Sequence, residues 1–332
     1  MADREPVTPQ EFVADLLPAD TSLSAGSVVC VGVFDGVHRG HQAVVRQARA
    51  VADALAAQDV AAGGIATRIP VVAVTFDPHP RSVLRADEPS PSLCAVSTRV
   101  RLLRDAGCDA VLLITFTTAV AAMSATAFVQ QCLVDTLRAR AVVVGADFRF
   151  GARAAGDVAL LTDLGTRSGF AVHPVASVGR AGQRWSSSGL RGLLARGDVA
   201  EAAEILGRWY AVEGTVVEGE RRGRELGYPT ANIDVDPGRA LPADGVYAGW
   251  LSVDERRMPA AISVGTNPQF AGQTRTVEAY AIDEQGLDLY GRHAECEFVA
   301  RIRGQQVFDD LAGLRHQMAD DVAVSRRILV EA

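Results

Sequence analysis

The 332-residue chain has no long apolar run, no CxxC pair of cysteines and no block of basic side chains. Its most apolar stretch, Ala110 to Met123, is too short and too rich in threonine to span a bilayer. A net charge of −7 without clustered lysine or arginine excludes the basic surface that nucleic acids require. We therefore expect no membrane and no nucleic-acid partner, and small molecules as substrates.

Cysteine is scarce, and the five cysteines are scattered along the chain. They are expected to be buried thiols in a reducing cytoplasm. The first ten residues are acidic and proline-bearing, unlike a signal peptide. Both observations predict a cytoplasmic protein. The cysteines are Cys30, Cys94, Cys108, Cys132 and Cys296.

The chain is long enough for two domains, and it has no internal repeat or low-complexity linker. Strand and helix patterns alternate from Val28 to Ala176, which predicts an α/β domain with a parallel sheet covered on both faces. Short strand patterns without helices follow from Ala211, which predicts a small antiparallel β-barrel. A helix from Asp309 to about Leu329 closes it. We place the division near Trp209, giving domains 1–208 and 209–332.

The hydrophobic periodicity predicts individual elements. Strands of the first domain are expected at 28–33, 71–76, 110–115, 141–144 and 170–176. Helices are expected at 41–57, at 97–107, in a long segment ending near Arg140, and at 158–168. Two short helices follow between Ser186 and Gly207, the second opened by a capping box of Asp198 and Glu201. Barrel strands are expected at 211–217, 247–253, 260–264, 277–282 and 296–302.

The segment GVFDGVHRGH, Gly32 to His41, joins the first strand to the first helix. A glycine-bearing turn that opens a helix directs backbone N–H groups and the helix dipole at one point, which suits a phosphate. His38 and His41 stand where the helix begins, so both imidazoles can donate hydrogen bonds to charge developing in phosphoryl or nucleotidyl transfer. Two surface histidines or a metal pair remain alternatives, although no third ligand of suitable spacing lies nearby.

Two further segments follow strands of the same predicted sheet. TFDPHP carries Asp77 and His79 in a loop stiffened by two prolines, and the sequence assigns neither residue a role. GADFRFG places Asp147, two aromatic residues and an arginine between glycines, a composition suited to holding a base or ring system. Either segment alone also fits ordinary turn chemistry.

The segment RWSSSGLRGLL places three serines just before a helix that carries Arg191. Serines at a helix start cap the helix in most proteins. Here the arginine adds a fixed cation that could hold a phosphate together with the hydroxyls.

Together these four segments resemble the FMN adenylyltransferase module of bacterial bifunctional FAD synthetases, a branch of the HxGH nucleotidyltransferases. The resemblance implies a Rossmann-like domain in which His38 and His41 steady ATP phosphates while the phosphate of FMN attacks the α-phosphorus and pyrophosphate leaves. It implies a catalytic role for Arg191 as well. The residues that it implies for nucleotide and flavin binding are Gly32, Phe34, Asp35, Gly40, Asp147, Ser187 and Ser188.

The segment SSSGLR departs from that family, which usually shows Ser-Ser-Thr, two further residues and an arginine. Ser187, Ser188 and Arg191 keep the hydroxyls and the charge. Gly189 adds backbone freedom worth roughly 0.5–1 kcal/mol relative to alanine. The departure predicts adenylyl transfer that is slower than usual.

In the second half, GRELGYPTAN forms a glycine-bearing loop before a strand. Gly223 and Gly227 make a loop that can close over a nucleotide, and the strand presents Thr230 and Asn232 on one face. A hydroxyl and an amide oxygen so placed suit Mg²⁺ and phosphate oxygens. The same residues alone also fit an ordinary hairpin with two polar residues on its wet side.

The segments GTNPQF (265–270) and RTVEAY (275–280) follow, and Glu278 shares a strand face with Thr276 and Tyr280. A carboxylate inside the mouth of the barrel could take the proton from a primary alcohol. An isolated glutamate on a strand is more often only a solvated side chain.

This half resembles riboflavin kinase, through the glycine-rich stretch running into PTAN, the GTNPxF segment and the glutamate of the next strand. The resemblance implies that Thr230 and Asn232 bind Mg²⁺ and ATP phosphates. It implies that Glu278 is the base that activates the ribityl 5′-hydroxyl of riboflavin. Riboflavin, FMN, FAD and ATP would then be the substrates or products.

The whole chain is therefore interpreted as a bifunctional enzyme that makes FMN in its second half and FAD in its first. The HxGH loop also occurs in class I aminoacyl-tRNA synthetases, but the acidic composition and the PTAN barrel count against that reading. A different alternative is a riboflavin kinase whose first domain is catalytically weakened or serves as a regulatory flavin- or nucleotide-binding module. The sequence leaves a homo-oligomer open.

Overall fold

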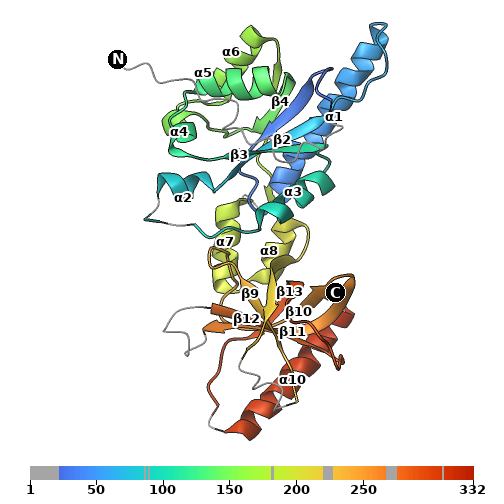
Figure 1. Ribbon diagram of the computed structural model, residues 1–332, viewed down its shortest axis with the longest axis vertical. Helices are drawn as coiled ribbons and strands as arrows, with labels where there is room; N and C mark the ends of the chain where they lie inside the picture. Colours follow the sequence, from blue (N-terminus) through green and yellow to red (C-terminus); the bar gives the residue numbers. More distant parts are fainter. Residues whose placement is uncertain are drawn as a thin grey trace. The chain divides into compact units, whose positions relative to one another are not determined.

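The computed structural model describes residues 22–85, 87–88, 90–180, 183–219, 227–266, 275–308 and 310–332. The chain forms two compact units, drawn in Figure 1. The first ends at Trp185, whereas the second begins at Ser186 and also includes Pro91–Ala95. The predicted α/β sheet lies in the first unit, and the predicted β-barrel lies in the second.

The first unit is built on a five-stranded parallel sheet, as predicted. Its spatial order is β3-β2-β1-β4-β5, so the chain winds one way from β1 and then returns to the other side of it. Ligands bind such sheets at the carboxyl ends of the strands where the winding reverses. The loop that follows β1 therefore lies at the position that favours a ligand. The strands are β1 (Ser27–Val31), β2 (Val71–Asp77), β3 (Ala110–Thr115), β4 (Ala139–Gly145) and β5 (Ala171–Val175).

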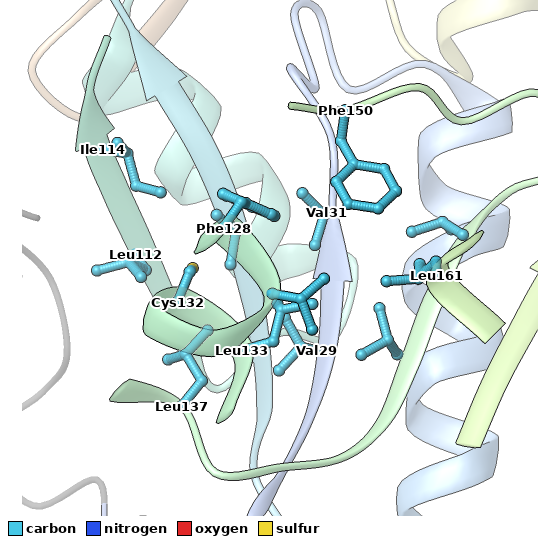
Figure 2. Packing of buried hydrophobic residues seen from close by; sticks show 14 of the residues in the cluster. Val29, Val31, Leu112, Ile114, Phe128, Cys132, Leu133, Leu137, Phe150 and Leu161 are labelled. Atoms are coloured by element: carbon cyan, nitrogen blue, oxygen red, sulfur yellow. The ribbon is translucent and has the colours of Figure 1, made fainter. Parts of the chain in front are cut away.

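Both faces of the sheet are buried along most of β1 to β4, because these strands are mainly apolar, whereas the edge strand β5 is partly exposed. Val28 and Cys30 of β1 pack into one cluster with α1 (Arg39–Ala61) and α3 (Val96–Asp105). Val29 and Val31 point to the opposite cluster, which Figure 2 shows with Phe128 and its neighbours. All five cysteines are buried free thiols, which confirms the expectation of buried thiols.

The long helix predicted to end near Arg140 is shorter and less regular in the structure, and it ends at Thr136. The segment forms α4 (Thr118–Ala121), α5 (Ala125–Phe128) and the π-helix η2 (Val129–Thr136), and Arg140 belongs to β4. Thr117 and Ser124 each accept a hydrogen bond from a backbone N–H three residues on, so each starts a new helix. The remaining elements are α2 (Pro80–Leu84), the 3₁₀ turn η3 (Ala152–Ala154), α6 (Val158–Ser168), β6 (Gly179–Arg180) and β7 (Gln183–Arg184).

The second unit is a closed antiparallel barrel of six strands with a C-terminal helix, as predicted. The order around the barrel is β10-β11-β12-β9-β8-β13. Helix α10 (Leu311–Val330) is capped by Asp310 and packs on β10, β11 and β13. The strands are β8 (Tyr210–Val217), β9 (Ala231–Val235), β10 (Gly245–Val253), β11 (Arg256–Thr266), β12 (Arg275–Ala281) and β13 (His293–Arg303).

Helices α7 (Ser187–Arg196) and α8 (Val199–Leu206) belong to the barrel unit. Helix α8 packs on β8 and β13, so the compact units divide before α7 rather than at the predicted residue 208. As a boundary between two functions, that division stays a prediction. The predicted capping box is absent, because Asp198 makes no side-chain cap bond and instead accepts from Arg196 Nε at 2.9 Å.

Two candidate active sites

The loop from Gly32 to His41, here called the phosphate loop, ends with His38 as the N-cap of α1. His38 Nδ1 accepts hydrogen bonds from the backbone N–H groups of Gly40 at 3.1 Å and His41 at 3.3 Å. A neutral imidazole that accepts through Nδ1 carries its proton on Nε2. His38 is therefore held with Nε2–H as a donor at the start of a helix.

His41 stacks on His38, with ring centroids 3.7 Å apart and an interplanar angle of 18°. Its side chain is partly exposed, but Nδ1 is buried and has no hydrogen-bond partner among the described residues. Burial, then the neighbouring His38 and then the Arg99 guanidinium lower the pKa of His41 well below its ordinary value. The ring is thus neutral at neutral pH. The structure brings the two predicted histidines together as one stacked pair.

Close contacts within this loop leave no room for a side chain at two of its glycines, Gly40 and Gly32. A Cβ on Gly40 would lie 2.9 Å from His38 Cε1 and would push the imidazole from its cap position. A Cβ on Gly32 would lie 3.1 Å from the ring of Phe34. Phe34 and Val37 have positive φ angles of 52° and 39°, which are costly for non-glycine residues and collect at functional sites.

Residues of the two other motifs of the first unit make structural contacts, and the binding role predicted for Asp147 stays a prediction. Asp147 forms an ion pair with Arg184 at 2.6 Å, and both side chains are half exposed. Phe150 is buried in the core and stacks on Phe148, so the aromatic pair of GADFRFG helps to build the hydrophobic core shown in Figure 2. His79 caps α2 by accepting from the backbone N–H of Arg81 at 3.0 Å, which gives this residue a structural role.

The first unit also has an open pocket of about 560 Å³ that the sequence does not predict. It is formed by residues from α2, α4 and η3, which follow the carboxyl ends of β2, β3 and β4. The residues that line this pocket are mainly small and apolar and are far apart in the sequence, so no local motif predicts the pocket. Residues lining it include Val83, Leu84, Thr118, Ala121, Ala122 and Arg153.

Ser187, Ser188 and Arg191 belong to the second unit. The helix cap is supplied by the preceding Ser186, whose Oγ accepts from the backbone N–H of Gly189 at 3.1 Å. Arg191 Nε donates to the backbone carbonyl of Pro91 at 2.6 Å. A contribution of these residues to phosphate binding by the first unit stays a prediction.

In the barrel, the structure brings Thr230, Asn232 and Glu278 together. Thr230 Oγ1 donates to Glu278 Oε2 at 3.4 Å. Asn232 on β9 is the register partner of Glu278 on β12, so their side chains share one face of the sheet. Glu278 was expected inside the barrel mouth. It instead faces away from Val277 and Ala279, the buried residues on either side of it.

Gly219, which the sequence analysis missed, lies against the Asn232 amide. A Cβ at this position would come within 2.2 Å of Asn232 Nδ2 and 2.7 Å of Oδ1. Gly219, Thr230 and Asn232 line a cavity of about 240 Å³, together with Glu284 and Tyr290. Only the folded barrel reveals this close approach. Gly227 has a left-handed φ of 88°. The predicted Gly223 and residues 267–270 of GTNPQF lie outside the described residues.

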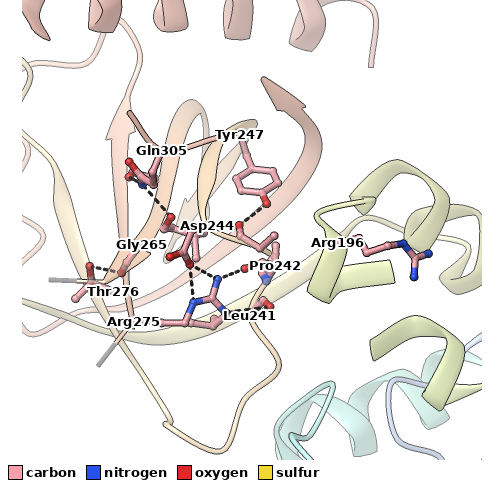
Figure 3. A network of polar contacts seen from close by, with 12 residues as sticks. Arg196, Leu241, Pro242, Asp244, Tyr247, Gly265, Arg275, Thr276 and Gln305 are labelled. Carbon is pink, nitrogen blue, oxygen red and sulfur yellow. Dashed lines mark hydrogen bonds and ion pairs between the residues drawn. The ribbon is translucent and has the colours of Figure 1, made fainter. Parts of the chain in front are cut away.

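Arg275, the first residue of the RTVEAY motif, has a structural role that Figure 3 shows. Its guanidinium contacts Asp244 Oδ1 and the carbonyl oxygens of Leu241 and Pro242. These bonds fix the segment that leads into β10 against β12. The arginine therefore positions the strand that carries Glu278.

Comparison with known proteins identifies the family. The family model for FAD synthetase matches residues 20–189, and the model for riboflavin kinase matches residues 206–329. A bifunctional riboflavin kinase/FMN adenylyltransferase of Escherichia coli K12 is 35% identical over 302 residues, which cover 91% of this chain and 92% of that protein. The chain belongs to this bifunctional family. The proteins of the same name from Pseudomonas fluorescens and Listeria monocytogenes are 34% and 32% identical, over 91% and 92% of this chain and 93% of each protein.

A crystal structure of a Streptococcus pneumoniae chain named a macrolide-efflux protein has the same fold. The TM-score is 0.79 at 30% identity, covering 92% of this chain and 96% of that chain. Within the part of our chain that the structure describes, no helix is sufficiently long and apolar to cross a membrane.

The donors of the kinase half fit a magnesium ion. Across the described residues, no three His, Cys, Asp or Glu side chains cluster in a way that could hold a metal. Mg²⁺ in kinases is usually held by one or two protein oxygens together with substrate phosphates and water. The Thr230 hydroxyl and the Asn232 amide oxygen meet that requirement, and the absence of a side chain at Gly219 leaves room beside the amide.

Proposed function

We propose that the chain converts riboflavin to FMN in the barrel unit and FMN to FAD in the sheet unit, with ATP as co-substrate of both reactions. The observation that carries the proposal is the contact of Thr230 with Glu278, opposite Asn232, inside the segment that matches riboflavin kinase. The sheet unit carries a separate site, the stacked histidine pair, inside the FAD synthetase match.

In the kinase reaction Glu278 takes the proton of the ribityl 5′-hydroxyl, whose oxygen forms a bond to the γ-phosphorus of ATP. The bond from that phosphorus to the ADP oxygen breaks. Thr230 is hydrogen-bonded to the carboxylate and orients it. Thr230 and Asn232 would hold Mg²⁺, which supplies neutralisation of phosphate charge when bound. A base in this position typically contributes about 10²–10⁴-fold in rate.

In the adenylyl transfer a phosphate oxygen of FMN forms a bond to the α-phosphorus of ATP, and the bond to pyrophosphate breaks. His38 donates from Nε2 and the first turn of α1 offers backbone N–H groups to the phosphates. Because His41 is neutral, it orients the phosphates by hydrogen bonding without adding a fixed charge. The flavin ring would lie over the open pocket beyond the strand ends, which α2, α4 and η3 line.

The alternative is a kinase whose sheet unit binds nucleotide or flavin without efficient catalysis. Gly189 after the serines is the feature in its favour. Both readings predict FMN formation, and only the bifunctional reading predicts FAD.

The test is incubation of the full chain with riboflavin, ATP and Mg²⁺, with the flavins separated by chromatography. The proposal expects FMN first and FAD afterwards. FMN without FAD supports the alternative, and the absence of both products contradicts the enzyme proposal. FMN supplied directly, without riboflavin, serves as the control for the second step.

We also propose a cytoplasmic location, supported by the five buried free thiols. Each proposed reaction uses its own polar cluster, so the proposal requires neither a nucleic acid nor a membrane. Sedimentation of the full chain distinguishes a monomer from a homo-oligomer.

A further inference from the structure

A buried arginine of the first unit lacks a counter-charge. Arg99 lies on α3 and is 2% exposed. Its guanidinium carries a positive charge. Within the described parts of the chain no carboxylate pairs with Arg99, and its buried Nε has no hydrogen-bond partner. Burying an unpaired charge is costly, so the chain holds a cation whose anion is missing.

The second unit shows how a mostly buried arginine can be compensated within the fold. Arg303 Nη2 lies 2.7 Å from Asp321 Oδ2, and its Nε donates to Oδ1 at 2.9 Å. Asp321 is itself buried, so this cation and its anion compensate each other inside the fold. Arg99 departs from that arrangement, which points to an anion that comes from outside the chain.

Hydrogen bonds connect Arg99 to the phosphate loop through Thr75. Its Nη1 donates to the carbonyl of Phe76 at 2.8 Å and to Thr75 Oγ1 at 3.3 Å. The Thr75 hydroxyl in turn donates to the carbonyl of Val33 at 2.8 Å, inside the loop. The positive charge also acts on His41, whose Nδ1 is the other unpartnered buried nitrogen of this region. Arg99 is thus linked to the loop by hydrogen bonds and by its field.

We propose that Arg99 is a positioning residue of the adenylyl transfer site, and that its charge is balanced by a phosphate group held in the phosphate loop. The inference rests on the proposed adenylyltransferase function. Arg99 holds the loop through Thr75, and it supplies the positive charge that the neutral His41 does not. In a site shielded from water, such a charge acts on phosphate more strongly than an exposed arginine does.

The reverse reaction tests this role without interference from the kinase unit. Pyrophosphate and FAD are supplied: an oxygen of pyrophosphate bonds to the adenylyl phosphorus, and the bond to the FMN phosphate breaks to release FMN and ATP. The variants are Arg99→Met, which removes the charge, and Arg99→Lys, which keeps it. Arg101→Met is the matched control, because it removes an exposed arginine from the same helix. The melting temperature of each variant reports whether the sheet unit that carries Arg99 is intact, and the rate of riboflavin phosphorylation reports on the barrel unit.

For Arg99→Met we expect the KM for pyrophosphate to rise about tenfold or more, with the KM for FAD changed less than twofold. Arg99→Lys should recover much of the pyrophosphate affinity, and Arg101→Met should match the wild type. A pyrophosphate KM within twofold of wild type in Arg99→Met would overturn the proposal. Equal increases in both KM values would also overturn it, because a merely structural role would not separate the two substrates.

If Arg99→Met fails to fold, the Arg99→Lys variant tests the proposal by itself. Measurable FMN release with a pyrophosphate KM raised less than tenfold supports the role of the charge, whereas complete loss of FMN release overturns it. If the proposed adenylyltransferase function is itself wrong, the wild-type chain releases no FMN from FAD and pyrophosphate, which distinguishes that outcome from a failure of the Arg99 proposal.

Discussion

Gly219→Ala isolates the contribution of Asn232 to the kinase reaction. The new Cβ would lie 2.2 Å from Asn232 Nδ2 and 2.6 Å from Cγ, and Cβ atoms essentially never come closer than 3.0 Å to such atoms. The amide must therefore move by about 1 Å. It is the end of a flexible side chain, so the pairing of β8 with β9 at Asn232 survives and the unfolding free energy changes little.

A displacement of about 1 Å of a positioning group can cost about 10²-fold in rate, which corresponds to about 2.7 kcal/mol of transition-state stabilisation. We expect Gly219→Ala to lower kcat/KM for riboflavin phosphorylation by about that factor. FAD formation from supplied FMN should be unchanged. The assay is chromatographic separation of the flavins in initial-rate samples, with the melting temperature measured in parallel.

Gly192→Ala is the matched control, since the nearest atom to its new Cβ is Arg196 Nη1 at 3.6 Å, an ordinary contact. Its kinase rate should equal that of the wild type. Wild-type kcat/KM in Gly219→Ala, at an unchanged melting temperature, would refute the argument that Asn232 must stay in place.

Three further predictions follow from the two sites. Glu278→Gln should abolish FMN formation while FAD synthesis from supplied FMN continues; simultaneous loss of both activities in chromatographic assays would contradict the division of sites. Gly40→Ala should displace His38, because the new Cβ would lie 2.9 Å from Cε1, and should reduce FAD synthesis at least tenfold with the kinase rate intact. Burial lowers the pKa of His41 in the folded chain below its value in the unfolded chain. As pH falls below about 6.5, the unfolded chain therefore takes up a proton at this histidine before the folded chain does, and the protein loses stability. Thermal denaturation from about pH 7 to about pH 5 should therefore show a smaller loss for His41→Gln than for the wild type, and equal losses would contradict the burial argument.

Much of the fold follows from local pattern. The strand predicted at 110–115 and the helix predicted at 158–168 have those bounds in the structure. The helix is unambiguous because Asp157 caps its start and Gly169 ends it in the left-handed conformation, with φ of 83°. The short strand patterns of the second half, with no helices between them, likewise predict the barrel, and burial alternates along β12 as expected for its strands.

The features that escaped prediction depend on tertiary contacts. The caps at Thr117 and Ser124 interrupt a segment whose apolar residues read as one helix. Strand alternation predicts that Glu278 shares a face with Thr276, but the register that places Asn232 opposite Glu278, and the face that is buried, are set by barrel closure. Gly219 and Arg99 are unremarkable in the sequence. Each becomes informative only when the residue that it touches, Asn232 or Thr75, is brought beside it.

The most direct test of two reactions in one chain follows the phosphorus of ATP into the flavins. Wild-type protein is incubated with riboflavin and Mg²⁺, once with ATP labelled at the γ-phosphorus and once with ATP labelled at the α-phosphorus. We expect the γ-label in both FMN and FAD, and the α-label in FAD alone. An α-label that enters no flavin, or FAD that lacks the γ-label, would contradict the account.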